Sequence, residues 1–150
     1  MKLIQIRRLS VLAFLTMFVA ACTSIHISKI DPQAYPMRLV CIEENPEVTV
    51  DGFVIAVQNG FQRHGIPSKV FVGSTAPQGC EYVLQYTARR GWDMVSFLKY
   101  AEIRVSHQGM LVGSATYRHA GGFGFNKYAS TETKVYRLTD KLLVGFTPSR

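Results

Sequence analysis

Cysteine and histidine carry the most versatile chemistry in this chain, and their spacing limits what that chemistry can be. The three cysteines, Cys22, Cys41 and Cys80, include no C-x-x-C pair. No two of the four histidines stand at a metal-ligand spacing: they are His26, His64, His107 and His119. Structural zinc sites draw on closely spaced cysteine and histidine pairs. We therefore expect no metal centre, with metal binding by two cysteines as the weaker alternative to a disulfide.

Other catalytic patterns are incomplete. A glycine-rich segment at 121–124 lacks a GK[ST] element and has Lys127 where a GxGxxG pattern requires glycine. We therefore expect no nucleotide and no other cofactor. Ser96, His119 and Asp93 could be assembled into a triad, yet the sequence has no GxSxG elbow to support one. We predict no catalytic residue.

The N-terminal segment has the layout of an export signal, in which cationic residues precede a short apolar run and small residues. The apolar stretch 9–21 follows Lys2, Arg7 and Arg8 and is shorter than the roughly 20 residues that cross a bilayer as a helix. It ends in Val-Ala-Ala-Cys22, which resembles the lipobox of bacterial lipoproteins. That resemblance implies cleavage after residue 21, diacylation of the Cys22 sulfur and an acyl chain such as palmitate on its nitrogen. An ordinary secretory peptide cut before Thr23, or an apolar N-terminal helix, is the alternative.

The residue after the modified cysteine helps to sort lipoproteins between membranes. Here it is Thr23, not the aspartate associated with retention in the inner membrane. We therefore expect a lipid anchor at the periplasmic face of the outer membrane, with the periplasmic or extracellular face of the inner membrane as the alternative. Nucleic acid is excluded as a partner by this compartment.

Removal of residues 1–21 changes both the charge and the cysteine count. The formal net charge falls from +7 to +4, because three of the cations lie in the leader. Cys41 and Cys80 then remain as an even pair in an oxidising compartment, which predicts a disulfide between them. A loop of 39 positions closed in this way would stabilise the fold by about 4 kcal/mol in the chain-entropy model.

The mature chain divides into a tether and one domain. Residues 22–37 contain two prolines and no sustained hydrophobic period, so they are expected to be a lipidated tether. Residues 38–42 are rich in strand-forming residues. Asn45-Pro46 is typical of a helix cap followed by a first-turn proline, and the glutamates 43, 44 and 47 suit a helix N-terminus. The stripe Val50, Val54, Val57 and Phe61 continues that helix until Gly65.

Downstream, the hydrophobic period changes from helical to alternating. We expect strands at 69–72, 81–89, 97–106 and 110–118, with a tight turn at Gln108-Gly109 between the last two. A final helix begins near Ser130 or Thr131 and carries Val135, Leu138 and Leu142 on one stripe.

This order predicts an α+β fold. We expect a mixed sheet of about five strands, formed by a parallel strand–helix–strand unit and a three-stranded antiparallel meander, with two helices on one face. The single domain spans 38–145, and 146–150 form a tail.

Basic and aromatic residues are expected to gather at one end of the meander as a binding surface. Such groups suit an acidic glycan, a lipid headgroup or a protein partner. A solvated face with one aromatic plugging the core edge is the alternative. The residues are Arg89, Arg90, Trp92, Lys99, Tyr100 and Arg104, together with Phe123 and Phe125 of the glycine-rich loop.

The segments 99–105, 113–117, 121–124 and 131–134 together resemble an uncharacterised family of small bacterial lipoproteins. The resemblance covers most of 38–145. The order of elements is also similar to that of the periplasmic domains of envelope-assembly lipoproteins, which implies a binding or scaffold role.

Two functional hypotheses follow. The first is a membrane-tethered, non-enzymatic binding or assembly module whose partner is an envelope protein or glycan. The alternative is an envelope enzyme acting on a cell-wall or lipid substrate, for which Asp93 and His119 are the residues to test.

Overall fold

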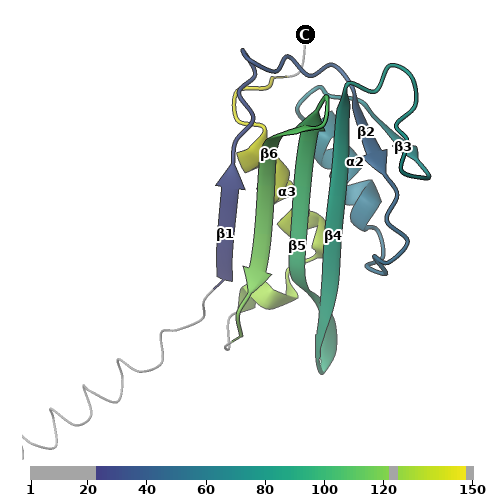
Figure 1. Cartoon of the computed structure of the whole chain (residues 1–150). Helices are drawn as coiled ribbons and strands as arrows, with labels where there is room; N and C mark the ends of the chain where they lie inside the picture. The colour runs from purple at the N-terminus through teal and green to yellow at the C-terminus, as the bar shows by residue number, and fades with distance from the viewer. Residues whose placement is uncertain (1–22, 122–124, 148–150) are drawn as a thin grey trace, which may run out of the picture.

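The computed structural model describes residues 23–121 and 125–147, which form one six-stranded mixed sheet and two packed helices. The strands lie in the order β1-β6-β5-β4-β2-β3 (Figure 1). This confirms the predicted α+β class. The elements are β1 (Thr23–Ser28), β2 (Val40–Glu43), α2 (Phe53–Gln62), β3 (Ser68–Phe71), β4 (Tyr82–Asp93), β5 (Val95–His107), β6 (Met110–His119), the 3-10 helix η2 (Phe125–Tyr128) and α3 (Thr131–Leu142).

The tether expected at 22–37 is wrong, because most of that segment belongs to the domain. β1 pairs antiparallel with β6 over six residues, from Thr23 opposite His119 to Ser28 opposite Ser114. Ile30 is then fully buried, and its N–H donates to the carbonyl of Leu142 at 3.0 Å. The two prolines had favoured an irregular tether, but they lie after the strand, in the connection to β2. The domain therefore begins at residue 23 of the described chain and not at 38.

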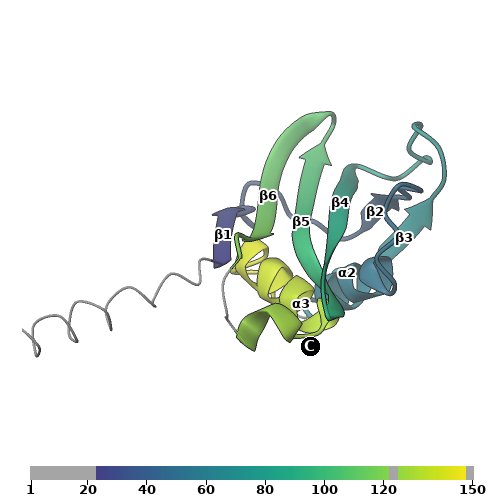
Figure 2. The same ribbon diagram turned by 90° about the horizontal axis from the view of Figure 1, so that it is seen from below.

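Both helices cover the same face of the sheet, and within the described residues no helix lies over the other face (Figure 2). The meander strands obey this one-sided burial: Tyr82, Leu84, Tyr86 and Ala88 of β4 are buried, while the residues between them are exposed or half-buried. The predicted alternation in β4, β5 and β6 is confirmed. The apolar stripe of α3 completes the core with Val135, Leu138 and Leu142.

The predicted parallel strand–helix–strand unit is confirmed, since β2 pairs parallel with β3. β2 also pairs parallel with β4, which was not predicted. Helix α2, however, begins at Phe53 and not near Asn45-Pro46. The side chain of Asn45 forms other hydrogen bonds: its amide donates to the carbonyl of Tyr86 at 3.0 Å, and its Oδ1 accepts from the N–H of Glu47. The N-cap is Gly52, whose φ of 69° suits a residue without a Cβ.

The β4–β5 hairpin is longer than expected and projects as an arm past the rest of the sheet (Figure 1). The segment 91–96, predicted as a loop, continues both strands and turns tightly at Met94, whose φ is 57°. The register shifts between Arg89 and Arg90, because Lys99 on β5 is paired with no residue of β4. A bulge of this kind bends a hairpin and increases its twist.

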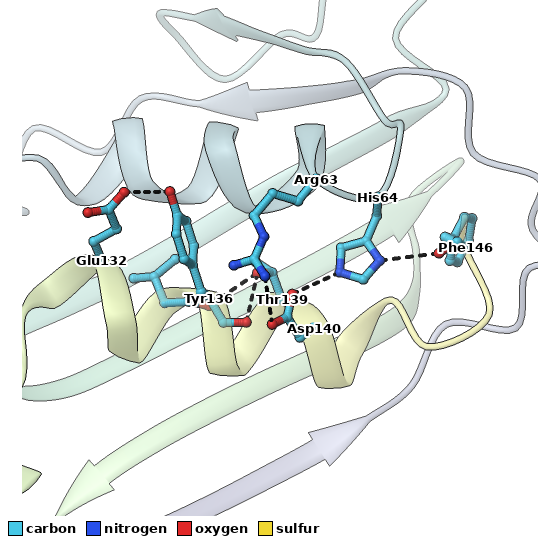
Figure 3. Close-up of polar contacts among 8 residues, drawn as sticks. Arg63, His64, Glu132, Tyr136, Thr139, Asp140 and Phe146 are labelled. Carbon is cyan, nitrogen blue, oxygen red and sulfur yellow. Dashed lines mark hydrogen bonds and ion pairs between the residues drawn. The ribbon is translucent and has the colours of Figure 1, made fainter. Parts of the chain in front are cut away.

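Helices α2 and α3 approach closely at Gly60. A Cβ on Gly60 would stand 2.5 Å from Oγ1 and 2.8 Å from Cγ2 of Thr139, and Thr139 is fully buried. Figure 3 shows Thr139 on α3 beside Tyr136 and Asp140, below α2, the helix that Arg63 and His64 directly follow. The glycine that weakens α2 as a helix is therefore what allows the two helices to meet.

His64, at the end of α2, joins this helix pair to the C-terminal segment. Its Nε2 lies 3.0 Å from Oδ1 of Asp140, and its Nδ1 lies 3.2 Å from the carbonyl oxygen of Phe146 (Figure 3). Both partners are acceptors, so the ring donates to both at once only when both nitrogens carry protons. Phe146 packs against the core, which corrects the expectation that order ends at residue 145.

We predict that Gly60→Ala destabilises the protein by about 1–3 kcal/mol, because the overpacking between the helices outweighs the gain of alanine in helix propensity. Thr139→Ala in the same chain should recover most of that loss, since it removes Oγ1 and Cγ2, the two nearest of the three atoms that the new methyl group meets. Urea unfolding of the two single variants and the double variant measures this coupling. Additive effects of the two substitutions would contradict the proposed close contact.

Candidate binding site

The uncovered face of the sheet is polar. The residues that alternate with the core positions point to this face and bear amides, hydroxyls and charges. Strand register places Gln85 opposite Arg104 and Thr87 opposite Glu102. Arg104 is in turn opposite Ser114 on β6, and Glu102 is opposite Thr116. The three central strands thus present neighbouring hydrogen-bonding side chains across the middle of the face.

A groove of about 380 Å³ lies on this face, where the end of β2 meets β4 and β5. Three carboxylates and one guanidinium give it an acidic balance. Such a groove can accept hydrogen bonds from hydroxyl or amine groups of a ligand and can hold a cation-bearing group. Its lining residues are Glu43, Glu44, Asn45, Pro46, Gln85, Tyr86, Thr87, Glu102 and Arg104.

Neutral donors, one from an adjacent strand and one from the same strand, hold two of the groove carboxylates in place. Gln85 Nε2 donates to Glu43 Oε2 at 2.8 Å, and the hydroxyl of Tyr100 donates to Glu102 Oε2 at 2.9 Å. The Glu102 hydrogen bond and the burial of Tyr100 both raise the pKa of that phenol, burial being the larger cause. The loop after β2 is fixed as well, because the N–H of Asn45 donates to the hydroxyl of Tyr86 at 3.1 Å.

Sequence reasoning assigned the glutamates of this loop to a helix N-terminus, and did not single out the groove. Glu102 and Gln85 were recognisable as outward-facing residues from the alternation of β4 and β5. Their meeting with Glu43 depends on β2 lying beside β4, which the order of elements along the chain does not specify. The predicted Arg104 does line the groove.

The structure does not gather the predicted basic and aromatic surface in one place. Arg89 and Tyr100 are opposite each other on the uncovered face, with the guanidinium 5.9 Å from the ring centroid. Arg90 instead reaches the segment directly before α2, where its guanidinium lies 2.7 Å from the Asp51 carboxylate and donates to the carbonyl of Thr49. The shifted register between Arg89 and Arg90 separates the two arginines and explains the error.

Trp92, near the tip of the β4–β5 arm, and Lys99, farther along β5, line a second cavity of about 350 Å³. Asp93 and His119, the two residues of the enzymatic alternative, line the same cavity, whereas Ser96 lies in a different depression. Asp93 forms an ion pair with Lys127, and this contact raises the pKa of the lysine. The carboxylate is therefore already committed to a cation.

His119 is 5 % exposed, and its ring meets Phe97 edge to face at 5.5 Å. Burial lowers the pKa of this imidazole, and the cations of Lys134, Lys127 and Lys99 lower it further. The imidazole is thus packed in the interior, beside the Asp93–Lys127 ion pair. Among the described residues that line the cavity, none is a serine or cysteine that could act as a nucleophile.

Lys134 is the buried charge that the sequence did not indicate. It lies on α3 directly before Val135, the first of the predicted stripe residues, and is 3 % exposed. Its Nζ donates to the carbonyl of Leu98 at 3.4 Å and to that of Lys127, and it stands 5.4 Å from the centroid of the Tyr117 ring. Burial lowers its pKa to about 8.

The predicted disulfide between Cys41 and Cys80 is present, with 5.7 Å between the two Cα atoms. Cys41 lies on β2 and is fully buried. The bond fixes the loop before β4 to the strand beside it and so supports the groove from one side. Cys22 and Phe123 lie outside the described residues. Phe125 begins η2, directly after the undescribed segment 122–124.

Comparison with known proteins gives a fold match without a family match. No protein-family model and no curated protein matches the chain. Among solved structures it is similar to the PelC dodecamer from Paraburkholderia phytofirmans, with a TM-score of 0.56 and 13 % identity over 86 % of this chain and 100 % of that chain. A single-substitution variant of the same dodecamer matches with a TM-score of 0.55 and 14 % identity, again over 86 % of this chain and all of that one. At this identity the likeness shows the fold.

We predict that the free energy of unfolding rises with pH above 8, because the folded pKa of Lys134 lies below its ordinary value of 10.5. The unfolded state then binds more protons between the two values, and the gain from pH 8 to 9.5 should be about 1.5 kcal/mol. Lys134→Met should abolish this rise. Urea unfolding at several pH values in that interval measures it.

Lys141→Met is the matched control, since Lys141 is exposed in the last turn of the same helix. It should keep the pH dependence of the unmodified protein. A rise that persists in Lys134→Met and disappears in Lys141→Met would contradict the assignment.

Proposed function

We propose that this protein is a lipid-anchored, non-enzymatic binding and assembly module of the bacterial envelope, held at the periplasmic face of the outer membrane through Cys22. The observation that carries the proposal is the sheet face that neither helix covers. It offers a polar groove whose carboxylates are pre-positioned by Gln85 and Tyr100. A groove of this kind fits a hydroxyl-rich glycan or a polar protein segment, the two partner classes that an envelope module meets.

The anchor is supported by the order of residues at the N-terminal end. The lipobox-like quartet ends at Cys22, and β1 begins at the next residue. Two or three acyl chains give stable membrane attachment, whereas one chain is marginal. The Cys41–Cys80 disulfide fits a protein that matures in an oxidising compartment. Within residues 23–121 and 125–147, no helix is long and apolar enough to cross a bilayer.

The assembly part of the proposal is supported by the likeness to PelC, which forms a dodecamer. The sheet offers edges for such contacts, because β1 and β3 are its outer strands. At the β3 edge, Val70 and Val72 are 41 % and 81 % exposed. An apolar edge strand is a ready surface for another chain, and contacts between two different surfaces of identical chains close into rings.

We predict that Cys22→Ala abolishes incorporation of labelled palmitate and releases the protein from the outer membrane. Thr23→Asp should keep the label but move the protein to the inner-membrane fraction, because aspartate after the lipidated cysteine is associated with retention there. Sucrose-gradient separation of the two membranes measures both effects. Equal labelling of Cys22→Ala and the unmodified protein would overturn the anchor.

We also predict that the detergent-solubilised lipoprotein is a homo-oligomer, and that a Val70→Lys, Val72→Lys double substitution reduces it to the mass of one chain. Charge on an edge strand opposes pairing with another chain. Val144→Lys is the control, since Val144 is 51 % exposed and lies after α3. Native mass spectrometry reads the outcome, and a single-chain mass for the unmodified protein would refute self-assembly.

A further inference from the structure

The tip of the β4–β5 arm is apolar and exposed. Trp92, Met94 and Val95 are 79 %, 86 % and 59 % exposed, and they fall within four consecutive residues. Trp92 is the sole tryptophan of the sequence. Single exposed apolar residues are ordinary on protein surfaces, but a cluster of three large ones at a protruding tip marks a contact surface.

Turn geometry does not explain this composition. Met94 occupies the left-handed position of the hairpin turn, with φ of 57°, where glycine, asparagine or aspartate is favoured over an apolar residue. The opposite hairpin, between β5 and β6, uses Gln108-Gly109 at its own left-handed positions. The arm therefore keeps an apolar side chain at a cost in backbone conformation.

The arm lies at the end of the domain where β1 begins. Thr23 is opposite His119 on β6, and the adjacent pair Arg118 and Tyr100 is in line with Arg89 on β4. The start of β1 is thus level with Arg90, and the tip continues past that level by three or four residues. At roughly 3.3 Å a residue, this is about 10 Å. Figure 1 shows the arm extending beyond the start of β1.

We infer that the arm tip inserts into the interfacial region of the phospholipid bilayer that holds the anchor. The inference rests on the proposed acylation of Cys22. With β1 starting one residue after that cysteine, no spacer separates the domain from the membrane. An acyl anchor at this end therefore brings the protruding tip to the bilayer surface.

The charges around the tip fit phospholipid headgroups. Asp93, the acidic residue beside the tip, is neutralised by Lys127. Lys99 is exposed at the base of the arm, and among the described residues it forms no ion pair. Tryptophan with a flanking cation is the composition that favours the boundary between acyl chains and anionic headgroups. Tyr128, which is 49 % exposed and lies beside Lys127, adds a second aromatic side chain to this group of Trp92 and Lys99.

The test uses the full lipoprotein in vesicles of phosphatidylethanolamine and phosphatidylglycerol, with intrinsic fluorescence reporting on Trp92 alone. Bromine atoms placed near the headgroup end of the acyl chains should quench the emission of Trp92. Acrylamide dissolved in the water should quench this emission less when vesicles are present than in detergent-free buffer without vesicles. Bromines at the chain ends should quench little, since the tip reaches the interface and not the bilayer centre.

Met94→Asp should abolish the bromine quenching and restore the acrylamide quenching, because it places a charge at the tip without disturbing the core. Aspartate also suits the left-handed backbone, so the variant should fold. Met110→Asp is the matched control: Met110 is 63 % exposed at the opposite hairpin, and its substitution should leave Trp92 quenched by bromine.

Two outcomes would overturn the inference. In the first, the protein floats with the vesicles but Trp92 stays open to acrylamide and unaffected by bromine. In the second, Trp92 is shielded from acrylamide without bromine quenching, which would mean that another protein chain covers the tip. Mass spectrometry of the N-terminal peptide keeps the anchor separate: an unacylated protein whose Trp92 is nevertheless quenched by bromine would sink the anchor and leave the tip contact standing.

Discussion

The fold depends on burial of one face of a six-stranded sheet beneath two helices. Within residues 23–121 and 125–147 both helices cover that face, so the strand residues on the opposite face are in contact with solvent. This constraint produces the strict alternation in β4, where buried aromatic and aliphatic residues alternate with Gln85, Thr87 and Arg89. It also forces the helices together, which is why Gly60 has no room for a side chain beside Thr139.

The same constraint separates the two candidate contact surfaces. The groove lies in the middle of the uncovered face, near Gln85, whereas the apolar arm ends nine residues later at Met94. An extended strand of that length spans roughly 30 Å. If the arm rests in the bilayer interface, the groove faces the aqueous space well away from the headgroups. A membrane contact and a soluble ligand can then be held by one rigid hairpin without competing for the same surface.

Much of this fold is legible in the sequence, because alternation and helical stripes directly encode which side of an element is buried. The three meander strands, α3 with its Ser130 cap and the disulfide pair were all readable in this way. β1 was not, since its six residues include only two apolar ones and two prolines follow it. Its place is decided by β6, which offers an unpaired edge and an apolar row for Ile25 and Ile27. The start of α2 was misplaced because Asn45 binds to β4 instead of capping a helix.

The candidate site was less legible, for the related reason that it is built across strands whose neighbours are set by tertiary topology. The basic and aromatic residues were predicted to form one cluster because they are close in sequence. A single bulge at Lys99, however, places Arg89 and Arg90 in different surroundings. Farther along the arm, beside its tip, Asp93 pairs with Lys127, whose carbonyl oxygen accepts a hydrogen bond from the buried amine of Lys134.

This chain of contacts gives Asp93 and His119 a structural reason to be near each other. The ion pair and the buried ring join the arm to η2 and α3, and they fix the direction in which the tip points. Both residues take part in contacts that attach the arm to its neighbours: Asp93 pairs with Lys127 of η2, and the His119 ring packs against Phe97 of β5.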